Sequence, residues 1–130
     1  MKKLVYLISP SKIKKNFYSD LDKVLSHKNV KFFQLRLKNI KFNDYLKIAK
    51  KIKKITSKHK VKFIINDNYI LANKIKADGC HMGQNDGTFK NARKKLKSKI
   101  LGITCHNSKI FAKNAVEEKA DYIAFGSFFR

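Results

Sequence analysis

The sequence predicts an α/β fold of the (β/α)8 TIM-barrel type, of which the chain holds about the first six βα units. Short apolar runs alternate with stretches of helical periodicity, and polar side chains gather directly after several of those runs. Regular alternation of strand and helix indicates parallel βαβ units, and functional side chains of a barrel lie at the carboxyl ends of its strands. Since 130 residues suit one domain, we expect a single partial barrel domain over 1–130.

Six apolar runs have the length and composition of strands that are covered on both faces. They are Leu4–Ile8, Val30–Leu35, Val61–Ile65, Gly79–Met82, Ile100–Thr104 and Tyr122–Gly126. Between them, apolar residues recur at helical spacing. These helical stretches cover residues 13–25, 45–55, 69–75, 89–96 and 110–116.

An open, doubly wound sheet is the alternative arrangement of such units. Its usual fingerprint is Gly-x-Gly-x-x-Gly in the turn after the first strand. That turn reads Ser9-Pro10-Ser11-Lys12 here. Polar residues instead follow the second, third, fourth and fifth strands, as they do at the mouth of a barrel. The barrel is therefore favoured.

The charge balance is strongly basic, with 31 Lys and Arg against 9 Asp and Glu and a formal net charge of +22. Such a balance is typical of proteins that bind polyanions. The lysines between Lys47 and Lys54, however, lie opposite an apolar stripe and form the solvated face of an amphipathic helix. No aromatic–basic stripe accompanies them. A nucleic-acid partner is therefore disfavoured, and a basic RNA-binding module remains the alternative from another class.

Two further features are the cysteines and the apolar run near the amino terminus. Cys80 and Cys105 lie in apolar runs without metal or redox spacing, so we expect buried thiols. The apolar run Leu4–Ile8 is too short for a signal peptide or a membrane span. We therefore expect a cytoplasmic protein without a membrane partner, and a homo-oligomer is left open.

A basic triplet ends the second strand. Gln34, Arg36 and Lys38 alternate with apolar residues and should share one side of the strand. Arginine offers a planar fork to phosphate oxygens, and lysine offers a point charge. Solvated basic residues at a strand end are an equally simple explanation of the triplet alone.

Two carboxylates follow neighbouring strands. Asp67 comes after the third strand and Asp86 after the fourth, and such a pair suits Mg²⁺ together with water and substrate phosphate oxygens. Taken singly, Asp67 would cap a helix that begins near Asn68, and Asp86 would form a turn with Gly87. The conjunction of both carboxylates with the basic triplet favours a metal site.

Three further polar residues lie at or near strand ends. Thr104 has a hydroxyl that can donate to a phosphate oxygen, although β propensity alone would explain it. His81 lies inside an apolar run, and we expect it to be packed and hydrogen-bonded. His106 follows the fifth strand and is better placed to transfer a proton.

Five motifs occur in order over nearly the whole chain: Gln34–Lys38, Ile64–Asp67, Ala77–Asp86, Leu101–His106 and Ala120–Gly126. They resemble the successive signatures of the thiamine-phosphate synthase/thiazole tautomerase family. The resemblance implies a (β/α)8 barrel transferase of thiamine biosynthesis with Mg²⁺ as cofactor. Such an enzyme couples hydroxymethylpyrimidine diphosphate with thiazole phosphate and releases thiamine phosphate and diphosphate.

The resemblance also implies residue roles. It assigns pyrimidine diphosphate binding to Gln34, Arg36, Lys38, Asn66 and Thr104, magnesium binding to Asp67 and Asp86, and catalysis to Arg36 and Lys38. His106 is the third catalytic candidate because of its place after the fifth strand. Thr104 stands where the family usually has serine. The reaction needs no protein nucleophile, because cationic groups stabilise the charge that grows on the departing diphosphate.

Three departures accompany the resemblance. Leu37 replaces a common acidic residue, and Asn68 replaces a frequent arginine. Family members continue beyond the position of Arg130 with a Thr/Lys-rich phosphate loop and strands 7 and 8. We therefore expect strands 7 and 8 to be absent from this chain. We also expect the chain to be a fragment with little or no activity alone. A thiazole tautomerase-like isomerase, with His106 moving a proton, and an inactive barrel fragment remain alternatives.

Overall fold

Strands and helices alternate along the whole described part of the chain, residues 3–129 of the computed structural model. The strands are β1 (Val5–Ile8), β2 (Val30–Leu35), β3 (Lys62–Asn66), β4 (Gly79–Met82), β5 (Ile100–His106) and β6 (Tyr122–Phe125). The helices are α1 (Phe17–Leu25), α2 (Phe42–Lys58), α3 (Tyr69–Lys74), α4 (Phe89–Leu96) and α5 (Lys109–Glu117). The expected βα units are therefore confirmed.

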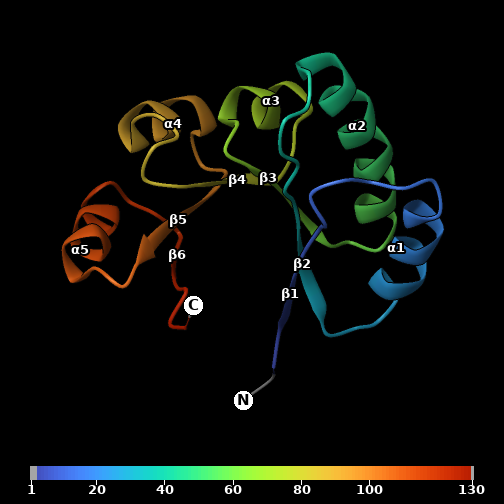
Figure 1. The fold of residues 1–130 in the computed structure, drawn as a ribbon, viewed down its shortest axis with the longest axis horizontal. Coiled ribbons are helices and arrows are strands. Elements are labelled where there is room, and N and C mark those ends of the chain that lie inside the picture. Colours follow the sequence, from blue (N-terminus) through green and yellow to red (C-terminus); the bar gives the residue numbers. More distant parts are fainter. Residues whose placement is uncertain (1–2, 130) are drawn as a thin grey trace.

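All neighbouring strands pair in parallel, and their spatial order is their sequence order, β1-β2-β3-β4-β5-β6. A doubly wound sheet reverses its strand order at a switch point, so the sheet in residues 3–129 is not of that kind. The sheet curls, and the helices cover its outer side (Figure 1). The result is a curled half-barrel whose first and last strands, β1 and β6, border its open side.

The strand bounds agree with the apolar runs to within two residues. The largest difference is β5, which continues to His106 because that residue pairs with Phe125 of β6 after an irregularity in register. Helix α1 begins at Phe17 rather than Ile13, since the chain first makes a turn in which the Phe17 N–H donates to the carbonyl of Lys14. Tertiary context thus moves the element ends but not their order.

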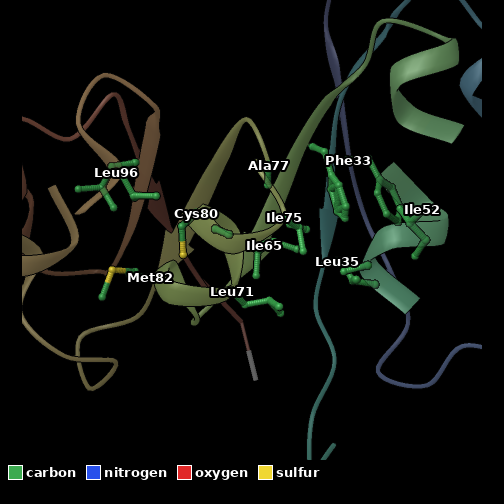
Figure 2. Packing of buried hydrophobic residues seen from close by; sticks show 14 of the residues in the cluster. Phe33, Leu35, Ile52, Ile65, Leu71, Ile75, Ala77, Cys80, Met82 and Leu96 are labelled. Atoms are coloured by element: carbon green, nitrogen blue, oxygen red, sulfur yellow. The ribbon is translucent and has the colours of Figure 1, made fainter. Parts of the chain in front are cut away.

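The apolar core lies between the outer face of the sheet and the helices. Figure 2 shows Phe33 and Leu35 of β2 near Ile52 of α2, and Cys80 and Met82 of β4 among the neighbouring apolar side chains. These residues have almost no exposed surface. Each large aliphatic side chain buried in this way contributes roughly 1.5–3 kcal/mol.

Helix α2 has the two faces that the sequence predicts. Tyr45, Ala49 and Ile52 are buried against the sheet, whereas Lys47 and Lys50 are exposed. Cys80 and Cys105 are buried free thiols, and burial raises the pKa of both. Within residues 3–129, the helices are too short or too polar to cross a lipid bilayer.

Two aspartates at strand starts hold the amino ends of the sheet together. The carboxylate of Asp78 accepts the N–H of Phe63 at 2.7 Å, and that of Asp121 accepts the N–H of Leu101 at 2.8 Å. Arg93 of α4 also donates to Asp121, at 2.7 Å. Charged acceptors make strong hydrogen bonds, so these contacts fix β3 and β5 at the end opposite to the polar clusters.

Candidate functional site

A cavity of about 890 Å³ opens at the carboxyl ends of the strands, on the inner side of the curled sheet. Its lining includes every residue that the sequence predicts for the site: Gln34, Arg36, Lys38, Asn66, Asp67, Asp86, Thr104 and His106. Parallel strands bring their carboxyl ends to one edge, which is why residues from β2, β3, β4 and β5 converge here.

The basic triplet follows the alternation expected of a strand, even beyond the last residue of β2. Gln34 is 3% exposed, while Arg36 and Lys38 extend into solvent at the cavity. Leu37 is 6% exposed and belongs to the apolar core. The N–H of Arg36 donates to Ser9 Oγ at 2.9 Å, which ties the end of β2 to the loop after β1.

Asp67 does not cap helix α3. That role belongs to Asn68, whose Oδ1 accepts the N–H of Leu71 at 2.8 Å. Asp67 has a φ of 67° and donates its own N–H to the carbonyl of His81 at 2.8 Å. Aspartate tolerates this left-handed conformation better than most residues. The turn leaves the Asp67 carboxylate free to face the cavity, where Lys38 Nζ donates to it at 2.8 Å.

Asp86 is held by the loop after β4. Its Oδ2 accepts the N–H of Gly83 at 2.7 Å, and a Cβ at Gly83 would lie 2.7 Å from that same oxygen. Burial raises the pKa of Asp86, and the neighbouring Asp67 carboxylate raises it further. The Gly83 N–H and the Lys38 charge act in the opposite direction but do not cancel this rise. Two neighbouring carboxylates repel each other unless a cation or a proton lies between them.

This pair fits a magnesium ion. Mg²⁺ takes hard oxygen ligands and commonly uses one or two carboxylates, with water and phosphate oxygens completing its shell. Asp67 and Asp86 supply such oxygens beside Arg36 and Lys38, which suit phosphate. Among residues 3–129, no set of three or more His, Cys, Asp or Glu side chains gathers around a point that would hold a metal.

Asn66 brings an unpaired donor to the cavity. The residue is 5% exposed, and its buried Nδ2 makes no hydrogen bond to the described residues. Leaving such a group unsatisfied costs about 1–3 kcal/mol. A ligand oxygen in the cavity would accept this donor.

The inner side of the sheet holds a hydrogen-bonded chain that sequence reasoning missed. Gln34 Nε2 donates to Tyr6 Oη at 2.9 Å, and Tyr6 Oη lies 2.6 Å from Tyr122 Oη. Tyr122 Oη lies 2.9 Å from His81 Nδ1, and His81 Nε2 lies 2.7 Å from Thr104 Oγ1. We call these five residues the inner network. They connect β1 with β6, and all five line the cavity.

His81 is packed and hydrogen-bonded, as its apolar surroundings predict. Its ring stacks on the ring of Tyr122 with 5.5 Å between centroids. Burial lowers the pKa of His81, and this effect exceeds the opposite effect of the Asp67 charge. Burial also raises the pKa of Tyr6 and of Tyr122, so both hydroxyls stay protonated. Gly102 is the one sequence signal that could have pointed to the position of Tyr122. It pairs with Tyr122, and its missing side chain makes room for the phenol ring.

His106 lies at the rim of the cavity. It has a φ of 50°, its side chain is exposed, and its ring approaches Phe111 of α5 with 6.3 Å between centroids. The position gives access to a bound ligand from the solvent side. The catalytic role of His106 remains a prediction.

The comparisons with known proteins agree on one family. Residues 5–130 match the family described as thiamine monophosphate synthase. The thiamine-phosphate synthase of Pelagibacter ubique is 60% identical over 129 residues, which are 98% of this chain and 62% of that protein. The thiamine-phosphate synthase of Erythrobacter litoralis is 41% identical over 96% of this chain and 60% of its own length.

One solved structure agrees with this family, and a second shares only the fold. Thiamine phosphate pyrophosphorylase from Pyrococcus furiosus superimposes with a TM-score of 0.84 at 26% identity, covering 98% of this chain and 61% of its own. A truncated 3-deoxy-D-arabino-heptulosonate 7-phosphate synthase from Thermotoga maritima shares the fold alone, with a TM-score of 0.65 at 12% identity. The chain spans about three-fifths of the length of the curated relatives named above. It belongs to the thiamine monophosphate synthase family.

Proposed function

We propose that this chain carries the diphosphate- and magnesium-binding part of a thiamine-phosphate synthase. The proposed reaction is the transfer of hydroxymethylpyrimidine from its diphosphate to thiazole phosphate, in thiamine biosynthesis. The observation that carries the proposal is the meeting of Asp67 and Asp86 with Arg36 and Lys38 at one cavity. The two carboxylates suit Mg²⁺, and the arginine and lysine cations suit phosphate oxygens. Together they suit a magnesium-bound diphosphate.

Five polar side chains at the cavity have a defined role in this proposal. Arg36 and Lys38 bind the phosphate oxygens, and Lys38 exchanges part of its contact with Asp67 for the ligand. Asp67 and Asp86 hold Mg²⁺, which when bound neutralises charge on the diphosphate. Asn66 donates its unpaired Nδ2 to the substrate.

The chemistry is a departure followed by a capture. Diphosphate leaves the pyrimidine methylene carbon with the bonding electron pair, and the thiazole nitrogen then donates its lone pair to the resulting cation. Positive groups fixed beside the leaving group stabilise the charge that grows on it during departure. Arg36 and Lys38 provide this stabilisation from positions set by the end of β2.

The fold proposal is that β1 to β6 form the first six strands of a (β/α)8 barrel, in one domain over 1–130. The sequential strand order, the outer layer of helices and the polar inner edge support it. Its substrates would be small phosphorylated metabolites, and the site of action would be the cytoplasm. A homo-oligomer is compatible with this proposal.

The test is magnesium-dependent release of diphosphate from hydroxymethylpyrimidine diphosphate in the presence of thiazole phosphate. We expect Asp67→Asn and Asp86→Asn to reduce this release by at least about 100-fold. Asp44→Asn, at an exposed position in the first turn of α2, is the matched control for loss of one negative charge. Unchanged release in both site variants would reject the metal assignment.

The tautomerase-type isomerase is the second candidate because His106 lies at the cavity rim. It would use His106 to move a proton and would not need two carboxylates beside a basic triplet. His106→Gln should then abolish isomerase turnover, while diphosphate release would be absent in the unmodified chain. Salt-sensitive RNA binding that is unaffected by Asn66→Ala would instead support the basic RNA-binding module.

A further inference from the structure

The peptide unit between Leu35 and Arg36, where β2 ends, is held by the hydroxyl groups of two side chains. Its carbonyl oxygen accepts the hydroxyl of Tyr45 at 2.8 Å, and its N–H donates to Ser9 Oγ at 2.9 Å. A backbone carbonyl can only accept and a backbone N–H can only donate, so the direction of both contacts is fixed. Because the two groups of a trans peptide point in opposite directions, the unit is held from both sides.

Ser9 is placed for this contact by its own backbone. Its N–H donates to the carbonyl of Gln34 at 2.9 Å, so this one residue bonds to the backbone on both sides of Leu35. Its hydroxyl hydrogen has an acceptor in the carbonyl of Pro10 at 3.0 Å, which leaves the oxygen to accept from Arg36. A residue that precedes a proline favours extended backbone. Since Ser9 is only 8% exposed, water competes little for its hydroxyl.

Tyr45 lies near the start of α2 and closes the loop 36–41 onto the strand that the loop leaves. The residue is 7% exposed, and burial raises the pKa of its phenol, so the hydroxyl stays protonated and remains a donor. The backbone of Leu37 and that of Asn66 oppose this rise in pKa. The hydroxyl of Tyr45 therefore lies next to the backbone at the ends of both β2 and β3.

Arg36 leaves the held segment toward the cavity. Its side chain is exposed and lines the cavity, whereas Leu35 and Leu37 on either side of it are buried in the apolar core. Successive side chains of an extended chain point to opposite faces, so the two buried leucines direct Arg36 to the inner side. Ser9 and Tyr45 are not among the described residues that line the cavity. Their hydroxyl groups can therefore act on a ligand there only through the backbone that carries Arg36.

We propose that Ser9 and Tyr45 are positioning residues for Arg36, whose guanidinium they direct toward phosphate oxygens in the cavity by fixing the peptide unit between Leu35 and Arg36. A donor that is already in place needs no reorganisation when charge develops on the ligand, and a misplacement of about 1 Å can cost about 100-fold in rate. The identity of the ligand rests on the proposed function, whereas the order of the Arg36 backbone does not. The two parts are therefore tested separately.

The part that needs no ligand is tested by ¹⁵N relaxation of the backbone amides. We expect Ser9→Ala and Tyr45→Phe each to lower the order parameter of the Arg36 amide from about 0.85 toward about 0.6, with the first residues of β2 unchanged. Thr56→Val is the matched control, because it deletes another buried hydroxyl of α2, which donates to the Lys53 carbonyl at 3.0 Å. An unchanged Arg36 amide in both folded variants would overturn the proposal.

The link to the ligand is measured by calorimetric binding of inorganic diphosphate in the presence of Mg²⁺. We expect Ser9→Ala and Tyr45→Phe each to weaken binding by about fivefold, the effect of losing one hydrogen bond. Ser9→Thr keeps an accepting hydroxyl and should bind diphosphate as the unmodified chain does. In an Arg36→Ala background, Ser9→Ala and Tyr45→Phe should have no further effect, because no guanidinium is left to direct. Equal weakening in both backgrounds would show that the hydroxyl groups act independently of Arg36, contrary to the proposal.

The two failures are distinguishable. If inorganic diphosphate does not bind to the unmodified chain, the proposed function fails, and the order of the Arg36 amide still decides whether Ser9 and Tyr45 fix the backbone. If diphosphate binds equally well to the unmodified chain, Ser9→Ala and Tyr45→Phe, the proposed function stands and the positioning role of the two hydroxyl groups is wrong.

Discussion

Lys38 and Asp67 meet at 2.8 Å although they come from loops that follow different strands, β2 and β3. Their side chains are 42% and 32% exposed, so solvent screens the attraction between them. The pair thus holds a lysine next to a carboxylate that also lies beside Asp86. The ion pair therefore contributes little to the stability of the fold, and its main effect is to place a positive charge beside the two carboxylates.

Lys38→Ala should therefore separate stability from activity. An exposed ion pair contributes at most about 1 kcal/mol, so we expect a change below that limit in the free energy of unfolding by urea. Under the proposed function, diphosphate release should fall about 100-fold because a cation beside the leaving group is lost. Lys47→Ala on the exposed face of α2 controls for the loss of one positive charge. A stability loss of several kcal/mol in Lys38→Ala would contradict the expectation.

Asp86 should make the metal-free chain less stable as the pH rises. Burial and the Asp67 carboxylate raise the pKa of Asp86 in the folded chain above that in the unfolded chain. Between those two pKa values the folded state binds more protons, so its stability falls with rising pH. Asp86→Asn should flatten this fall and raise the unfolding free energy at neutral pH in the presence of a chelator.

The measurement is urea unfolding over a pH series, with and without Mg²⁺. Magnesium should narrow the difference between the unmodified chain and Asp86→Asn, since bound cation favours the charged carboxylate. Asp44→Asn again serves as the control for charge. A pH dependence that is identical in Asp86→Asn and the unmodified chain would be incompatible with a raised pKa at this position.

Gly102→Ala should disturb the inner network. A Cβ at this position would overlap the tip of the Tyr122 ring, and overpacking of this kind typically costs about 1–3 kcal/mol. The same substitution in a Tyr122→Ala background should cost clearly less, because the obstructing ring is gone. Thermal or urea unfolding of the four chains gives the comparison. An equal cost in both backgrounds would show that the crowding arises elsewhere.

Asn68→Ala should weaken helix α3. The Asn68 Oδ1 accepts the N–H of Leu71 at the start of the helix, and loss of such a cap costs about 1 kcal/mol. Asn43→Ala, at an exposed position that does not cap α2, should have a smaller effect. Both are compared by urea unfolding. Asn68→Asp should preserve the stability, because its side chain can accept the same hydrogen bond.

The sequence predicts the fold and the main cavity residues because both depend on local patterns. Buried parallel strands leave continuous apolar runs, and the polar residues that follow them must meet at one edge. The alternation of Gln34, Arg36 and Lys38 is of this kind, and all three line one cavity. Local capping rules were less decisive, since they suit both Asp67 and Asn68, and the structure gives the cap to Asn68.

The inner network could not be predicted in this way. Tyr6 and Tyr122 are separated by 116 positions, and each lies in an apolar run where a tyrosine is unremarkable. Their meeting depends on the curvature of the whole sheet, which no local pattern encodes. The same applies to Asp86, whose raised pKa depends on the approach of a carboxylate from another strand.

The contact between Tyr6 and Tyr122 also bears on the order of events during synthesis on the ribosome. Each βα unit pairs with its sequence neighbour, so most of the sheet can assemble as the chain emerges. The hydrogen bond between the Tyr6 and Tyr122 hydroxyls, by contrast, cannot form until residue 122 has been synthesised. A nascent chain halted before the sixth strand would therefore present the Tyr6 hydroxyl to water, and docking of that strand replaces this water with the Tyr122 hydroxyl.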